Sequence, residues 1–199
     1  MNEEEKNVPQ HIAIIPDGNR TWARRRGVSL EKAYERGIRK IGDVAKWCRK
    51  HGIKMLTMWG LSTENFQREK EEVEKLFFLF KKFLFEGLKR MEKEKRKEKN
   101  EVRVRFFGRK ELLPQEIRRM MNEVERRTKK NGPYQLNILL AYGGHADIVD
   151  GLNKAIKEGV GEVDEKSFLK FLPTGDLPPV DLVIRTSGAK RLSGLLPWH

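Results

Sequence analysis

The sequence has only one cysteine, Cys48, among its 199 residues. A single cysteine cannot form an intramolecular disulfide, and it excludes zinc and iron–sulfur sites built from several cysteines. No apolar run approaches the ~18 consecutive residues that a membrane-spanning helix needs. The first residues, MNEEEKN, are acidic and polar and therefore lack the pattern of a secretory signal. These absences predict a soluble cytoplasmic protein in a reducing compartment.

Common signatures of catalysis and of nucleic-acid binding are also missing. The sequence contains no P-loop, no GxGxxG fingerprint and no nucleophile elbow, and its four histidines show no metal-ligand spacing. The net charge of +13 favours an anionic partner, which could be a nucleic acid, a membrane surface or a small phosphorylated substrate. Because the basic residues are interleaved with acidic ones and no RNP-like aromatics or C₂H₂ spacing occur, we expect no nucleic-acid partner.

Short runs rich in Val, Ile and Leu alternate along the chain with long helical patterns. This alternation predicts a single α/β domain over residues 1–199, with a doubly wound, mostly parallel open sheet and helices on both faces. We expect strands at His11–Ile15, Met55–Leu61, Val102–Phe107, Leu136–Ala141 and Leu182–Arg185. We expect helices at Glu31–Lys50, Glu71–Lys97, Pro114–Lys130 and Ala146–Lys157, and a shorter one at Glu165–Phe171.

The helix expected at Glu71–Lys97 is apolar on more than one face over Leu76–Phe85. Such a helix is either packed into a core or a dimer interface, or it lines an apolar ligand channel. Its tail, Lys89–Lys99, is charged all round, which predicts a solvated extension of the helix.

Polar residues follow the expected strands, where ligands bind in an open parallel sheet. Asp17 and Gly18 come directly after the first strand, so that a carboxylate could hold a metal ion while nearby amides cradle a phosphate. Taken alone, this loop is more simply explained by an aspartate that caps a helix and a glycine that makes a turn. Arg185 ends an apolar strand, and a buried guanidinium there needs an anionic partner. With Arg191 and a hydroxyl from Ser193, it could grip a phosphate.

Four sequence blocks cover most of the chain in a fixed order: HIAIIPDGNRTWARRRG, LTMWGLSTENFQR, LNILLAYGGHADIVDG and VDLVIRTSGAKRLSGLLPW. They resemble the cis-prenyltransferase family of the undecaprenyl diphosphate synthase type. The resemblance implies a Mg²⁺-dependent transferase that condenses isopentenyl diphosphate with an allylic diphosphate, farnesyl or geranylgeranyl, in cis geometry. The product would be a polyprenyl diphosphate, the precursor of a glycosyl carrier lipid.

The resemblance also implies a role for each matching residue. Asp17 would bind Mg²⁺ and help the allylic diphosphate to depart, and Asn65 and Ser62 would organise the reacting groups. Trp22 would pack near the allylic chain, and Leu76–Phe85 would line the tunnel for the growing product. The residues implied in holding the allylic diphosphate are Gly18, Asn19, Arg20 and Arg68. Those implied in holding isopentenyl diphosphate are Arg185, Arg191 and Ser193.

Family members of this kind usually form homodimers, and a peripheral membrane contact would serve release of the product. This sequence departs from the family pattern at Thr21, Leu30, Tyr34, Ala189 and Lys190. It ends at His199, where relatives continue into a segment with a glutamate that is a second Mg²⁺ ligand. An alternative interpretation is therefore a non-catalytic subunit that binds prenyl diphosphates or supports an active partner.

Overall fold

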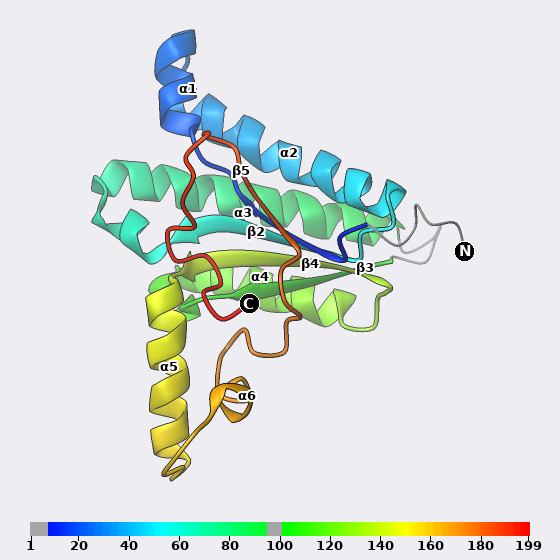
Figure 1. Ribbon diagram of the computed structural model, residues 1–199. Helices are drawn as coiled ribbons and strands as arrows, with labels where there is room; N and C mark the ends of the chain where they lie inside the picture. Colours follow the sequence, from blue (N-terminus) through cyan, green and yellow to red (C-terminus); the bar gives the residue numbers. More distant parts are fainter. Residues whose placement is uncertain (1–7, 95–100) are drawn as a thin grey trace.

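The computed structural model describes residues 8–94 and 101–199, which form a five-stranded sheet in the order β3-β4-β2-β1-β5. Every pair of neighbouring strands is parallel, which confirms the predicted α/β fold (Figure 1). The strands are β1 (His11–Ile15), β2 (Met55–Ser62), β3 (Val102–Phe107), β4 (Tyr134–Tyr142) and β5 (Leu182–Arg185). β1, β3 and β5 have the predicted bounds, whereas β2 and β4 are longer than predicted.

The longer helices lie where the sequence pattern predicts them, within a few residues at each end. They are α2 (Leu30–Lys50), α3 (Lys70–Glu94), α4 (Gln115–Thr128) and α5 (Gly144–Lys157). The predicted continuation of α3 to Lys97 lies outside the described residues. Two short 3₁₀ helices, η2 (Thr63–Gln67) and η3 (Lys110–Leu112), follow β2 and β3.

Two helical predictions need correction. A separate helix, α1 (Asn19–Arg26), follows β1 where only a loop with helix-opening amides was expected. The helix predicted at Glu165–Phe171 is shorter, because α6 spans Glu165–Phe168 and the chain then continues in turns. Phe171 and Leu172 leave the helix to pack against Ala155 of α5, so tertiary burial ends α6 before Pro173 is reached.

Alternation along the strands divides the core between the two faces of the sheet. Ile12 and Ile14 of β1 pack under α2, while Leu76 and Phe80 of α3 join the cluster under α3 and α4. On the opposite face, strand residues such as Trp59 pack against the C-terminal segment, which contributes Leu177, Leu195 and Leu196. Within the described residues, no helix is long and apolar enough to cross a membrane.

Glycines at two positions shape the start of α1. Gly18 has a φ of +95°, which side-chain-bearing residues rarely adopt, and α1 begins directly after it. A Cβ atom on Gly37 of α2 would lie 3.1 Å from Oδ1 of Asn19. The absence of a side chain at Gly37 therefore lets α2 approach the first turn of α1 closely, at the carboxyl edge of the sheet.

Candidate active site

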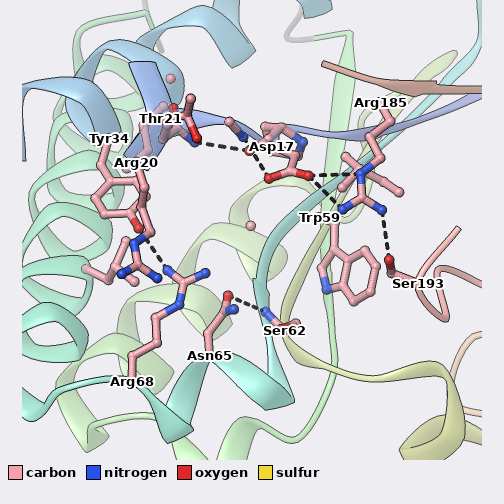
Figure 2. Close-up of a pocket in the computed structure, with 18 of the residues that line it drawn as sticks. Asp17, Arg20, Thr21, Tyr34, Trp59, Ser62, Asn65, Arg68, Arg185 and Ser193 are labelled. Carbon is pink, nitrogen blue, oxygen red and sulfur yellow. Dashed lines mark hydrogen bonds and ion pairs between the residues drawn. The ribbon is translucent and has the colours of Figure 1, made fainter. Parts of the chain in front are cut away.

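A cavity of about 920 Å³ lies at the carboxyl ends of β1, β2 and β5. α1, α2 and α3 provide its other walls (Figure 2). Its polar lining comes from the loops after the strands, from α1 and from Tyr34 of α2, whereas its apolar lining comes from α2, α3 and β2. The apolar wall is formed by Ile38, Ile41, Gly60, Leu76 and Phe80, whereas Trp59 lies near Arg185 and Ser193 (Figure 2). One end of the cavity therefore suits charged groups and the other suits hydrocarbon.

The first turn of α1 presents backbone amides to this cavity. The amide of Trp22 donates to the carbonyl of Gly18 at 2.9 Å and so makes the first helical hydrogen bond. The amides of Asn19, Arg20 and Thr21 precede that bond and have no partner within the helix. Unpaired amides at a helix N-terminus attract anions such as phosphate.

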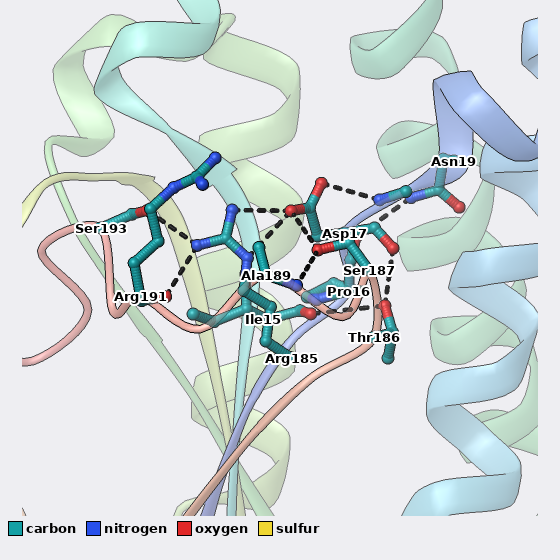
Figure 3. A network of polar contacts seen from close by, with 11 residues as sticks. Ile15, Pro16, Asp17, Asn19, Arg185, Thr186, Ser187, Ala189, Arg191 and Ser193 are labelled. Carbon is teal, nitrogen blue, oxygen red and sulfur yellow. Dashed lines mark hydrogen bonds and ion pairs between the residues drawn. The ribbon is translucent and has the colours of Figure 1, made fainter.

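Asp17 and Arg185 form an ion pair at the junction of β1 and β5 (Figure 3). Oδ2 of Asp17 accepts hydrogen bonds from Nε and Nη2 of Arg185 at 2.9 and 2.6 Å, and from the hydroxyl of Ser187 at 2.8 Å. Nη1 of Arg185 donates to Oγ of Ser193 and to the carbonyl of Arg191, both at 2.8 Å. One guanidinium thus joins the loop after β1 to the loop after β5.

The pKa of the Asp17 carboxyl reflects opposing influences. Partial burial raises this pKa, but the hydrogen bonds from Arg185, Ser187 and the Gly18 amide outweigh burial and lower it below its ordinary value of 3.8. Asp17 is therefore a carboxylate at neutral pH. The Arg185 side chain is 13% exposed, so the sequence argument that it needs an anionic partner is confirmed, and that partner is Asp17.

Arg68 occupies the other side of the cavity, where η2 leads into α3. Its Nη1 donates to the hydroxyl of Tyr34 and to Oε1 of Glu72, both at 2.8 Å. Nε of Arg20 lies 4.0 Å from the other oxygen of Glu72. Two guanidinium groups from different elements therefore gather around one carboxylate that is 12% exposed.

Ser62 and Asn65 lie between these two charged groups. Oδ1 of Asn65 accepts a hydrogen bond from the amide of Ser62 at 3.0 Å, which fixes the side chain over the start of η2. Figure 2 shows Asn65 between Arg68 and Ser62 at the polar end of the cavity. Because its oxygen faces the backbone, its amide nitrogen is the group available to a ligand.

The structure brings together all the predicted site residues except Trp22 and Arg191. Those that line the cavity are Asp17, Gly18, Asn19, Arg20, Ser62, Asn65, Arg68, Arg185 and Ser193. Trp22 instead lines a neighbouring, more apolar cavity of about 940 Å³ between α2, β1 and β5, where the guanidinium of Arg36 lies 5.3 Å from its ring centroid. The Arg191 side chain is exposed, and its carbonyl rather than its guanidinium takes part in the network around Arg185.

The residues around Asp17 fit a Mg²⁺ ion that is bound together with a substrate. Among residues 8–94 and 101–199, no three His, Cys, Asp or Glu side chains form a ready-made metal cluster. Mg²⁺ is commonly held by one or two carboxylates plus substrate phosphates, so a complete protein cage is not required. Oδ1 of Asp17 accepts the Gly18 amide at 2.7 Å and retains a lone pair for a cation.

Sequence reasoning did not assign a site role to Ser187, Glu72 or Tyr34. Ser187 was visible as a hydroxyl two positions after the last strand. Glu72 lies four residues after Arg68, which is the spacing of a helical ion pair. Tyr34 lies one turn before Gly37 on α2, and only the close packing of α2 and α3 brings it to Arg68.

The chain is similar to known prenyl transferases over nearly its whole length. The family model described as putative undecaprenyl diphosphate synthase matches residues 15–199. An isoprenyl transferase from Fusobacterium nucleatum is 39% identical over 98% of this chain and 82% of its own length. A geranylgeranyl-diphosphate-specific tritrans,polycis-undecaprenyl-diphosphate synthase from Archaeoglobus fulgidus is 40% identical, over 96% of this chain and 78% of its own.

Solved structures agree with the sequence relatives. The crystal structure of lavandulyl diphosphate synthase from Lavandula x intermedia in complex with dimethylallyl diphosphate is 31% identical, with a TM-score of 0.87. The match covers 98% of this chain and 84% of that one. This likeness therefore extends over almost the whole chain.

Proposed function

Because the chain belongs to the undecaprenyl diphosphate synthase family of cis-prenyltransferases, we propose that it condenses isopentenyl diphosphate with geranylgeranyl diphosphate to make a polyprenyl diphosphate. Several archaeal relatives that are about 40% identical carry the description geranylgeranyl-diphosphate specific, which favours this primer over farnesyl diphosphate. These relatives are synthases, which favours a catalytic role over a non-catalytic binding subunit.

One observation supports the two-substrate reaction above all others. Asp17 lies between two groups of cationic side chains at the polar end of the cavity (Figure 2). Arg20 and Arg68 lie on one side, and Arg185 lies on the other. A condensation between two diphosphate esters needs two separate anion sites that face a common point, and this arrangement provides them.

The allylic diphosphate is assigned to the side of the cavity formed by α1 and Arg68. The free amides of Asn19, Arg20 and Thr21 face a diphosphate there without reorganisation, and the side chains of Arg20 and Arg68 add charge. The isopentenyl diphosphate is assigned to the side with Arg185 and Ser193. Exposed Arg191 adds a guanidinium at the rim when its side chain turns toward the bound diphosphate.

Bond making then takes place beside Asp17 and Asn65. A carbon–carbon bond forms between the isopentenyl unit and the allylic carbon, the bond from that carbon to the diphosphate breaks, and a proton passes from the isopentenyl unit to the departing diphosphate. Asp17 would hold Mg²⁺, which neutralises charge on the departing diphosphate when it is bound. Asn65 and Ser62 orient the polar groups between the two sites. The amides of α1 stabilise the leaving group as its negative charge grows.

The apolar wall is assigned to the hydrocarbon chain. Leu76 and Phe80 of α3 line the cavity together with Ile38 and Ile41 of α2, and Ile38 packs against the cluster that contains Leu76 and Phe80. Each of these side chains removes isoprenoid surface from water, a contribution of about 25 cal/mol for each Å² of apolar area that is buried. Trp22, in the neighbouring cavity, contacts the chain only if the hydrocarbon extends past α1.

We also propose that the protein is a cytoplasmic homodimer with a peripheral membrane contact for release of its product. Val149, Leu152 and Ile156 lie three and four residues apart on α5, and all three are exposed. This spacing places them in one stripe on a helix that Figure 1 shows at the edge of the molecule with α6. A second copy of the same stripe is the occupant that we propose.

The test is incorporation of labelled isopentenyl diphosphate in the presence of Mg²⁺, with geranylgeranyl and farnesyl diphosphate offered separately. We expect incorporation with both, a lower KM for geranylgeranyl diphosphate, and products longer than the primer on chromatography. Chelation of Mg²⁺ should abolish turnover. Binding of both diphosphates without any incorporation would contradict the proposal and support the non-catalytic alternative.

A further inference from the structure

Tyr34 is a cavity residue to which the proposed reaction gives no task. We propose that it is a positioning residue, whose hydroxyl holds the guanidinium of Arg68 in the orientation that binds the allylic diphosphate. The inference rests on the proposed function, because it assumes that Arg68 contacts this substrate. Tyr34 itself acts through Arg68 rather than on the reacting atoms.

Tyr34, Arg68 and Glu72 form a closed triangle of hydrogen bonds, of which Figure 2 shows the contact between Tyr34 and Arg68. The Tyr34 hydroxyl donates to Oε1 of Glu72 at 2.8 Å and accepts from Nη1 of Arg68 at 2.8 Å. Nη1 of Arg68 also donates to the same Oε1 at 2.8 Å. Both protons of Nη1 are thus used inside the protein. Among the described residues, Nη2 and Nε of Arg68 have no hydrogen-bond partner, which leaves them for a ligand.

The hydroxyl favours this arrangement over a competing arrangement of the same charges, because it bonds to both Arg68 and Glu72. Glu72 lies four residues after Arg68, and a free arginine and a glutamate prefer a pair of parallel hydrogen bonds between one guanidinium and both carboxylate oxygens. That arrangement would turn a second nitrogen of Arg68 away from the cavity. In the structure the hydroxyl takes one Nη1 proton and also donates to Oε1 of Glu72, and the guanidinium bonds to that one oxygen and keeps its other nitrogens free.

The environment keeps the hydroxyl in the form that this role needs. Burial raises the pKa of Tyr34 to about 12, and the hydrogen bond to Glu72 contributes in the same direction. The phenol is therefore protonated at neutral pH and can donate and accept at once. Tyr34 belongs to α2, whereas Arg68 and Glu72 flank the start of α3, so the triangle also fixes the spacing of the two helices across the cavity.

The test is Tyr34→Phe, which removes the hydroxyl and keeps the ring. We expect the KM for the allylic diphosphate to rise about tenfold, in line with the loss of one hydrogen bond to a charged group. The kcat and the KM for isopentenyl diphosphate should stay within about twofold. Binding of inorganic pyrophosphate, measured by calorimetry without turnover, should weaken to a similar degree. Tyr134→Phe is the matched control, because Tyr134 starts β4 away from the cavity.

A double-mutant cycle separates positioning from a general structural role. If Tyr34 acts through Arg68, Tyr34→Phe should have no further effect on binding in an Arg68→Gln background. Equal effects in both backgrounds, or an unchanged KM in the single variant, would overturn the inference. Failure of the wild-type protein to incorporate isopentenyl diphosphate would instead count against the proposed function. The pyrophosphate measurement still decides the inference in that case, since it needs no catalysis.

Discussion

The two carboxylate oxygens of Asp17 have different surroundings. Oδ2 is occupied by Arg185 and Ser187, whereas Oδ1 accepts the Gly18 amide and faces the cavity. Asp17→Ala should lower kcat by roughly 1,000-fold, about 4 kcal/mol in the barrier, because the variant cannot hold a cation at the leaving group. Incorporation of labelled isopentenyl diphosphate measures this loss.

Circular dichroism of the same variant should retain the native spectrum, because Asp17 lies in a loop outside the hydrophobic clusters. Asp43→Ala is a suitable control, since Asp43 is an exposed residue of α2 that pairs with Lys40. Full activity of Asp17→Ala would show that this carboxylate has no role in catalysis.

Asp147 of α5 gives a prediction for pH. Burial raises the pKa of Asp147 above 3.8, although hydrogen bonds from Thr174 and Tyr142 oppose this shift. The folded state therefore holds the Asp147 proton more tightly than the unfolded state does. Asp147 stabilises the fold most below pH 3.8. Above that pH, its contribution to the free energy of unfolding falls as pH rises, until the carboxyl has ionised in the folded state as well. Asp147→Asn cannot titrate, so denaturant unfolding of both proteins across pH isolates the effect. If the free energies of unfolding of the wild type and of Asp147→Asn change in parallel with pH, the raised pKa of Asp147 is contradicted.

Most polar residues of the site could be predicted because they directly follow strands. Asp17 and Arg185 lie where a parallel sheet always exposes its loops, so their meeting required only the correct strand assignment. Tyr34 could not be placed in the same way. Its contact with Arg68 depends on the rotation and spacing of α2 against α3, which tertiary packing sets and local sequence does not encode.

α3 presents different phenylalanines to the cavity and to solvent. Phe80 is buried at the apolar end of the cavity, whereas Phe78 is 59% exposed on the same helix. Phe80→Ala should lengthen the product by one or more isoprene units, because the truncation opens space where the chain ends. The variant should also lose about 3–5 kcal/mol of stability, as large-to-small core changes do.

Reverse-phase chromatography of the dephosphorylated products would measure this change, at a temperature at which the variant remains folded. Phe78→Ala is the control, and its product distribution should match the wild type. An unchanged distribution for Phe80→Ala would mean that Phe80 serves the core and does not limit the chain.

α3 shows that a sequence pattern can predict a helix without deciding what its apolar faces contact. The apolar run Leu76–Phe85 left core packing and a ligand channel open, and in the structure Leu76 and Phe80 belong to both a core cluster and the cavity wall. The strands were predictable because each is a short apolar run between long helical patterns. α1 was missed as an element because its eight residues, NRTWARRR, carry almost no apolar periodicity and begin only through the turn at Gly18.

The exposed apolar stripe on α5 leads to a prediction about the oligomeric state of the protein. Leu152→Glu places a charge among Val149 and Ile156, so the dissociation constant of the proposed dimer should rise at least about 100-fold. Sedimentation velocity across a range of protein concentrations measures this constant. Leu112→Glu is the control, because Leu112 is 45% exposed on η3. A wild-type protein that stays monomeric at high concentration would contradict the proposal.

Arg185 lies on β5, a strand of four residues at the edge of the described sheet, with Leu182, Val183 and Ile184 each at least 37% exposed. Such an edge opens locally far more readily than central strands such as β2. One of the two proposed anion sites therefore includes a residue of a strand with a low expected opening free energy. If that site binds a diphosphate, docking of β5 and binding of the diphosphate are thermodynamically linked. Amide hydrogen exchange at residues 182–186 would report this linkage directly, as protection that grows with ligand concentration while exchange in β4 stays constant.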